Sequence, residues 1–184
     1  MTDDGGIERL EPRPRLDGPV QLAEHDPRWA SQGAEQVAGV VRVLGAHALL
    51  VEHVGSTSIT GLAAKPLLDL VVEVPDPRDE PSYVPPLADL GYRLVHREPG
   101  WHEHRLLKHD EPSVNLHVFG AGSPETTRMI VFRDTLRRDP AELERYAAAK
   151  RELAARSWVH VQDYADAKSD VVEAILRRAG APPR

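Results

Sequence analysis

The stretch VEHVGSTSITGLAAKPLLDLVVEV, residues 51–74, contains two strand-like runs separated by a turn of glycine and hydroxyl residues. The second run, PLLDLVVEV, alternates so that Leu68 and Leu70 fall on one face and Asp69 on the other. Because apolar residues lie on both faces, the run is typical of a central strand covered on each side. Asp69 is therefore predicted to lie inside the protein, where a carboxylate needs a cation, a basic side chain or several backbone donors.

Helix and strand signals on either side of this stretch predict an α+β protein. A helix is expected in HDPRWASQGAEQVAGVVRVLG, with Asp26 as N-cap and Pro27 in the first turn. Strands are expected in HALLVEHVG and YRLVHRE, and a hairpin in HEHRLLKHDEPSVNLHVFG. The five prolines of PDPRDEPSYVPP predict a loop, followed by a short helix at 86–90.

The last third of the chain changes to helical patterning. Helices are expected in PETTRMIVFRDTLRR, in DPAELERYAAAKRELAARS with Asp139 as N-cap, and in VQDYADAKSDVVEAILRRAG. We therefore predict a flexible tail over residues 1–18, an α/β core over 19–122 and a helical region packed on the core over 123–184.

Composition excludes several classes of protein. Hydrophobic residues make up 41% and charged residues 28% of the 184, as in an ordinary globular domain. The net charge of −6 argues against duplex nucleic acid as a partner. The absence of cysteine excludes disulfides and thiolate metal sites. With neither a secretory signal nor a membrane-spanning stretch in the sequence, we expect a cytoplasmic protein that does not bind membranes.

The turn after the first strand has the pattern of an anion site. Gly55, Ser56 and Thr57 would present backbone N–H groups and hydroxyls to a phosphate, although such a turn can equally cap a short helix. Asp69 follows on the next strand, so both are expected near one strand end. A Mg²⁺ ion suits a single carboxylate joined by substrate phosphates. Lys65 is the alternative partner for that carboxylate.

The block EHVGSTSITGLAAKPLLDLVVEV resembles the signature of the GrpB family, and DPRW, NLHVFG, FRDTLRRDP, YAAAKRELA and YADAKSDVV resemble its further blocks in order. The resemblance covers about residues 20–179. It implies a fold similar to polymerase-β-like nucleotidyltransferases, with a mixed β-sheet and flanking helices. In that superfamily a Gly-Ser turn holds the nucleoside triphosphate, and an Asp-x-Asp pair with a third carboxylate binds Mg²⁺. The resemblance thus assigns phosphate contact to Gly55 and Ser56, and metal ligation to Asp69.

The chain departs from that superfamily pattern at the second and third acids. Val71 stands where the second acid of the pair would be, and Glu73 lies about 13 Å from Asp69 along an extended strand. The strand expected to carry the third acid offers Asn115 and His117. These residues allow a one-metal site of Asp69 with Asn115 or His117, or a cleft without catalysis.

Basic and imidazole side chains supply further candidates. Lys150 and Lys168 each follow a tyrosine by four residues, so each Tyr–Lys pair shares a helical face and could reach phosphates, or could simply pack the helices. Arg133 offers bidentate geometry for phosphate. His53 precedes the glycine turn and could orient it, or could be a buried core histidine.

Three hypotheses follow for the function. The first is a Mg²⁺-dependent nucleotidyltransferase-like protein, with Asp69 and Ser56 in catalytic roles, that binds a nucleoside triphosphate and passes its nucleotidyl group to an unknown acceptor. The second is a non-catalytic relative that keeps the cleft; in either case the chain could act beside a fused or neighbouring enzyme. The third is a Zn²⁺ protein built on the histidines of the hairpin, which are His102, His104, His109 and His117.

Overall fold

The computed structural model describes residues 6–183 of the chain and contains one six-stranded sheet. The strand order is β1-β5-β6-β7-β4-β3, in which β4 and β7 run parallel and all other neighbours run antiparallel. The mixed sheet and its flanking helices confirm the α+β class. The strands are β1 (Glu8–Arg9), β3 (Leu50–Val54), β4 (Leu68–Val74), β5 (Arg93–Glu98), β6 (His104–His109) and β7 (Val114–Gly120).

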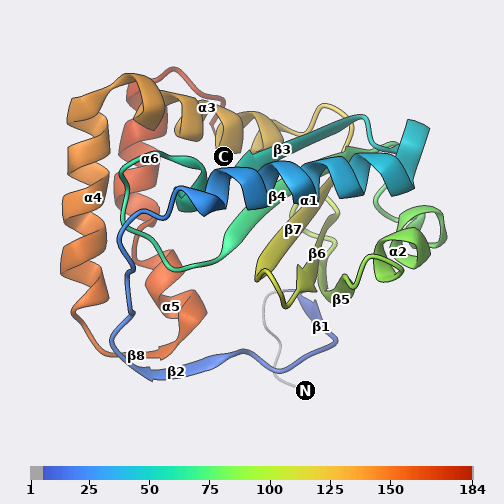
Figure 1. The fold of residues 1–184 in the computed structure, drawn as a ribbon, viewed down its shortest axis with the longest axis horizontal. Helices are drawn as coiled ribbons and strands as arrows, with labels where there is room; N and C mark the ends of the chain where they lie inside the picture. Colours follow the sequence, from blue (N-terminus) through green and yellow to red (C-terminus); the bar gives the residue numbers. More distant parts are fainter. Residues whose placement is uncertain (1–5, 184) are drawn as a thin grey trace.

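Helices cover both faces of this sheet, and Figure 1 shows α1 lying across it, with α4 and α6 side by side at one end. Short 3₁₀ turns, η1 (Gly45–His47) and η2 (Ser56–Ser58), stand before and after β3. No helix among the described residues has the length and apolar character needed to cross a lipid bilayer. The helices are α1 (Arg28–Leu44), α2 (Glu80–Ala88), α3 (Pro124–Arg138), α4 (Pro140–Ala154), α5 (Val161–Asp166) and α6 (Ser169–Arg178).

The central strand β4 is buried on both faces, as its sequence pattern predicts. Leu68 and Leu70 join the main core beneath α1 and α2. On the opposite face, Val71 packs with Val54 and Phe119 against α3. Asp69 lies on this second face, because side chains alternate along a strand. The strand thus carries its one half-exposed carboxylate toward the C-terminal helices.

Two short strands lie within the segment expected to be a flexible tail, residues 1–18. The strand β1 pairs with β5, and β2 (Arg15–Gly18) pairs with β8 (Trp158–His160) in a second, two-stranded sheet. Leu16 packs with Tyr164, so apolar contact as well as backbone pairing holds the segment. The expectation of a free tail is therefore corrected for these strands, while residues 1–5 lie outside the described part. The boundaries at 18/19 and 122/123 remain predictions.

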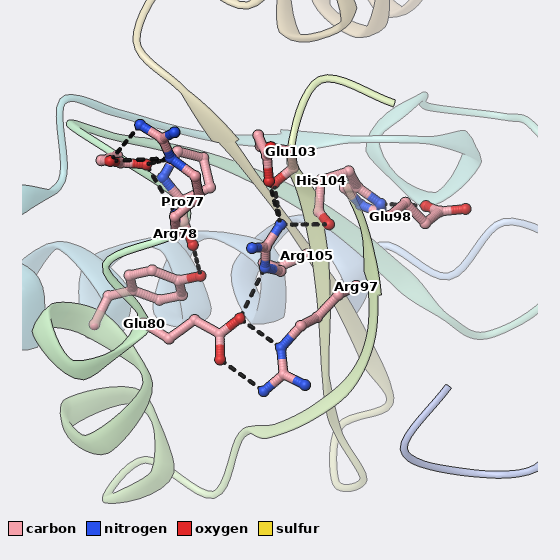
Figure 2. A network of polar contacts seen from close by, with 10 residues as sticks. Pro77, Arg78, Glu80, Arg97, Glu98, Glu103, His104 and Arg105 are labelled. Atoms are coloured by element: carbon pink, nitrogen blue, oxygen red, sulfur yellow. Dashed lines mark hydrogen bonds and ion pairs between the residues drawn. The ribbon is translucent and has the colours of Figure 1, made fainter. Parts of the chain in front are cut away.

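The proline-rich loop predicted after β4 is instead the helix α2. Pro81 lies in its first turn, where a missing N–H costs no helical hydrogen bond. Pro85 and Pro86 lie inside the helix, near its C-terminal end, and neither can donate a helical hydrogen bond. Tyr83 is fully buried and its hydroxyl donates to the Pro77 carbonyl at 2.7 Å. Glu80 accepts hydrogen bonds from arginines 97 and 105 on the sheet (Figure 2).

The C-terminal helical patterns are confirmed, with one break. Helices α3 and α4 begin at Pro124 and Pro140, and the Asp139 side chain caps α4 by accepting the N–H groups of Ala141 and Glu142. The last predicted helix is divided into α5 and α6 at Ala167 and Lys168. The Lys168 ammonium lies 4.4 Å from the ring centroid of Tyr164, so the break accompanies an inward-turned lysine.

We predict that Gly33→Ala destabilises the protein by about 1–3 kcal/mol. An added Cβ would stand 2.3 Å from Nδ1 of His53. Helix α1 and strand β3 are therefore in tight contact at this glycine. The matched control is Gly39→Ala in the same helix, where the nearest atom is a Leu90 methyl at 3.6 Å. That change should stabilise by about 0.5–1 kcal/mol. Urea unfolding measures both, and equal effects would contradict the tight contact at Gly33.

Candidate functional site

A cleft of about 700 Å³ lies between one face of the sheet and the C-terminal helices. Its walls come from β4, β6 and β7 on one side and from α3 to α6 on the other. Nine residues that the sequence analysis singled out line it together, although they are spread over more than 100 positions. They are Gly55, Ser56, Lys65, Asp69, His109, Asn115, His117, Lys150 and Lys168.

Asp69 is held at the floor of the cleft by the neighbouring strand β7. Asn115 lies beside it in the parallel register, and its amide Nδ2 donates to Asp69 Oδ1 at 3.0 Å. His117 follows one row along, with Nε2 3.9 Å from the same oxygen. Burial opposes ionisation of Asp69, but its polar contacts with His117 and Asn115 and the charge of Lys168 outweigh it and lower its pKa. The carboxylate is therefore ionised at neutral pH.

Gly55 gives Asp69 the room it occupies. Its φ is +71°, and a Cβ there would stand 2.5 Å from Asp69 Oδ2. Any other residue would combine a strained backbone with a collision against the carboxylate. Ser56 opens the turn η2 directly after this glycine, and the Ser58 hydroxyl donates to the Gly55 carbonyl at 2.7 Å. The glycine turn and the carboxylate thus form one packed unit at the cleft.

All four lysines of the sequence line this one cleft, whereas only Arg9, Arg13 and Arg93 do so among the arginines of residues 6–183. Lys108 joins Lys65, Lys150 and Lys168. Within residues 6–183 none of the four forms a salt bridge with a carboxylate. Asp69 is therefore left facing several ammonium groups, and the cleft has an excess of positive charge.

Lys150 on α4 and Lys168 at the break between α5 and α6 contact neutral groups. Lys150 is 3% exposed, donates to the Ala63 carbonyl at 2.7 Å, and lies 5.5 Å from the Tyr146 ring centroid. Burial, reinforced by the charge of Lys168, lowers the pKa of Lys150 to about 7. Burial also lowers the pKa of Lys168. An anion entering the cleft would favour the protonated form of both amines.

Arg133 and Glu73 are among the predicted residues that lie outside the cleft. Arg133 is buried under β3, where it donates to Glu52 at 2.7 Å, to Asp134 at 2.8 Å and to the carbonyl of His53. Glu73, at the far end of β4, accepts the backbone N–H groups of Gly122 and Ser123 at 2.9 and 3.1 Å. Both side chains are occupied in structural contacts, so the structure does not bring them to Asp69.

His53 and Thr57 hold the glycine turn from the opposite face of the sheet. The Thr57 hydroxyl donates to the Leu67 carbonyl at 3.2 Å, so its oxygen accepts from His53 Nε2–H at 3.0 Å. Burial lowers the pKa of His53 to about 4 and keeps the ring neutral. Neither side chain lines the cleft. The orienting role of His53 stays a prediction, while Thr57 is occupied in a structural contact between the turn and Leu67.

The hairpin histidines are only partly brought together. His104 and His117 stack with centroids 5.2 Å apart, and His104 Nε2 lies 3.0 Å from His117 Nδ1. His102 is exposed, and His109 Nδ1 bonds to the carbonyl of Pro112 at 2.9 Å. The expected convergence of three imidazoles, those of His102, His104 and His117, is therefore corrected, because only His104 and His117 meet.

Sequence reasoning missed His96 and Glu98 on β5 and Lys108 on β6. The first two share a strand face two residues apart, but only the register with β6 places them beside His104. A signal for Lys108 existed in the composition, since it is one of only four lysines.

The sequence profile described as GrpB protein matches residues 19–178, which is most of the chain. The chain belongs to the GrpB family. A UPF0157 protein of Halalkalibacterium halodurans is 48% identical over 162 residues, covering 88% of this chain and 83% of that one. The crystal structure of conserved protein GrpB from Enterococcus faecalis superimposes with a TM-score of 0.71 at 28% identity, covering 86% and 96% of the two chains.

A longer relative places a GrpB-like region beside further sequence. A dephospho-CoA kinase of Mycolicibacterium paratuberculosis is 29% identical to this chain over 188 residues. The match covers 88% of this chain but only 46% of that protein. In that relative, a GrpB-like region therefore shares one polypeptide with about as much additional sequence.

We predict that replacing His53 reduces the acid sensitivity of the fold. The unfolded chain protonates His53 near its ordinary pKa of 6.5, whereas the folded chain does so near 4. Stability is therefore lost as pH falls from 7 toward 4, by about 1–2 kcal/mol at pH 5. In His53→Gln the loss between pH 7 and pH 5, measured by urea unfolding, should shrink by that amount. An unchanged loss would mean that His53 is not buried neutral.

Proposed function

We propose that this GrpB-family protein binds a nucleoside triphosphate, with one Mg²⁺ ion, in the cleft between the sheet and the C-terminal helices. One observation carries the proposal: every lysine of an acidic protein lines the same cleft, without carboxylate partners among the described residues. Burying unpaired ammonium groups is costly unless an anion compensates them. A polyphosphate supplies that charge over the length of such a cleft.

The oxygen atoms beside Asp69 fit a hard cation. Mg²⁺ takes one or two protein oxygens and fills its remaining positions with water and substrate phosphates. The Asp69 carboxylate is one donor. The second is the Asn115 amide, whose Oδ1 is buried and without a hydrogen-bond partner in the described structure. Rotating this amide by half a turn would bring that oxygen to the side of Asp69. The ion would there neutralise phosphate charge that the lysines leave unbalanced.

The remaining lining of the cleft suits the less polar end of a nucleotide. Leu67, Leu106, Met129 and Phe132 contribute apolar surface close to the lysines. A cavity of about 700 Å³ is also within the range of sites that bury a ligand of this size. The combination of apolar wall and cationic floor therefore supports a nucleotide over free phosphate.

A binding module without transfer chemistry is the second candidate, and Val71 favours it. Two-metal transfer needs ions about 3.5–4 Å apart, held by more than one carboxylate. The position that would supply the second acid is fully buried against Val54 and Phe119. An acid there would lose hydration in an apolar cluster rather than face the cleft. Glu73 does not replace it, because its carboxylate caps the start of α3.

Release of pyrophosphate from ATP with Mg²⁺ and candidate acceptors separates the two functions. Transfer would cleave the bond between the α- and β-phosphates, join the nucleotidyl group to an acceptor hydroxyl or amine, and release pyrophosphate. Binding that leaves ATP intact over many hours supports the module. A labelled acceptor that depends on Asp69 supports the transferase.

We also propose that the protein acts together with a partner enzyme. The dephospho-CoA kinase relative joins a GrpB-like region to other sequence in one chain. A separate chain of the same family could serve a neighbouring enzyme by binding its nucleotide.

We predict that Lys150→Met weakens ATP binding by about 10–100-fold, the value of a hydrogen bond to a charged group. In the wild type, binding at pH 8 should take up close to one proton, because the pKa of Lys150 is about 7 when free and rises beside phosphate. Affinity should therefore fall as pH rises above 7. Calorimetry in buffers of different ionisation enthalpy measures the uptake, which Lys150→Met should lose. The control Arg42→Ala, exposed on α1, should bind normally.

We predict that Asp69→Asn abolishes the gain in ATP affinity that Mg²⁺ confers. Without Mg²⁺ the variant should bind ATP at least as tightly as the wild type, because a negative charge facing the phosphates is removed. Asp110→Asn is the control, since Asp110 also lines the cleft but pairs with Arg93. Titration of each protein with ATP, with and without Mg²⁺, checks this. The same Mg²⁺ dependence in all three proteins would exclude a metal at Asp69.

A further inference from the structure

Three potential metal ligands meet on the strands β5 and β6. The ligand atoms of His96, Glu98 and His104 all lie within 4.8 Å of one another. His104 Nδ1 is 2.5 Å from Glu98 Oε2, a contact visible in Figure 2, and His96 Nε2 is 3.4 Å from the same oxygen. His104 is 2% exposed and the other two side chains are below one-fifth exposed. The group is thus largely sheltered from bulk water.

The register of the sheet creates this group. Glu98 and His104 are direct antiparallel partners, so their side chains share one face. His96 lies two residues before Glu98 and points to the same side. Trp101 and Phe119 pack against the His104 ring, with centroids at 4.9 and 4.8 Å. The three ligand side chains therefore project from paired strands, and aromatic rings pack against one of them, His104.

We propose that His96, Glu98 and His104 bind a Zn²⁺ ion at the edge of the cleft. Two imidazoles and one carboxylate are a ligand set that zinc uses in catalytic sites, with a fourth position left for water. Tetrahedral bonds of zinc place neighbouring ligand atoms about 3.3 Å apart. The His96–Glu98 distance already has this value, and the Glu98–His104 distance must open by less than 1 Å.

The fourth coordination position of the zinc ion would open toward the cleft. Among the described residues no fourth histidine or carboxylate joins the group. His96 also lines the cleft, whereas aromatic rings enclose His104. The fourth ligand is therefore water or a group that arrives through the cleft. This site is separate from the magnesium position proposed at Asp69, and it uses different residues.

His117 lies between the two places, hydrogen-bonded to His104 on one side and 3.9 Å from Asp69 on the other. A metal on His104 Nδ1 leaves its proton on Nε2, which then donates to His117 Nδ1 at 3.0 Å. His117 must in turn carry its proton on Nε2, the nitrogen that lies 3.9 Å from Asp69. Zinc thus selects the tautomer that presents an N–H toward the Asp69 carboxylate. His117 acts as a positioning residue for the zinc ligand.

Zinc titration of the chelator-treated, full-length chain tests the proposal. Calorimetry and elemental analysis should give one ion per chain in the wild type. His96→Ala and Glu98→Gln should weaken binding by about 100-fold or more, the loss of a direct ligand. His117→Asn should weaken it by about 10–100-fold, the loss of an outer hydrogen bond. The control His102→Ala removes an exposed histidine of the same segment and should leave affinity unchanged.

Cobalt substitution gives a second readout that does not depend on activity. Co²⁺ in the wild type should show the intense visible bands of a four-coordinate ion, and these should disappear in Glu98→Gln while its circular dichroism stays native. Asp69→Asn should keep one zinc per chain, so loss of the Mg²⁺-dependent gain in ATP affinity and loss of zinc are separately visible. Equal zinc affinity in the wild type and Glu98→Gln overturns the proposal. The group would then be only a hydrogen-bonded Glu98–His104 pair.

Discussion

A carboxylate on an otherwise buried strand is the constraint around which this cleft is arranged. Asp69 stays ionised because Asn115 and His117 reach it from the parallel strand β7, and Gly55 leaves room for its oxygens. The apolar residues on either side of it build the core, so the strand cannot turn the charge outward. The helices that complete the protein must therefore provide polar cover over this point.

The different placement of lysines and arginines follows from this need for polar cover over Asp69. Arginines pair with carboxylates across the structure, as in the contacts of Arg97 and Arg105 with Glu80. The lysines instead converge on the cleft, where burial lowers the pKa of Lys150 to about 7. An ammonium group can lose its proton when buried, whereas a guanidinium cannot. Lysine therefore allows positive charge to be reduced in the buried part of the cleft, which arginine would not.

Sequence patterns predicted the helices and strands correctly where the apolar residues followed a single helical or strand periodicity. Asp139 and Pro140 predicted the start of α4. The alternation of side chains along β4 predicted that Asp69 and Leu70 lie on opposite faces of the sheet. They failed where distant contacts outweighed local preference. The proline-rich segment became α2 because Tyr83 fills the core and Glu80 binds two arginines of the sheet. The early strands β1 and β2 formed because partners existed far along the chain.

The sequence by itself determined the central strand, the glycine turn beside Asp69 and the helical last third, since each follows from spacing and backbone chemistry within a few residues. Only the tertiary structure decided which side chains share the cleft. It turned Arg133 and Glu73 into structural contacts and brought His96 and Glu98 beside His104. Strand order and register set these neighbours, and pairing between strands depends on the whole core rather than on any local stretch.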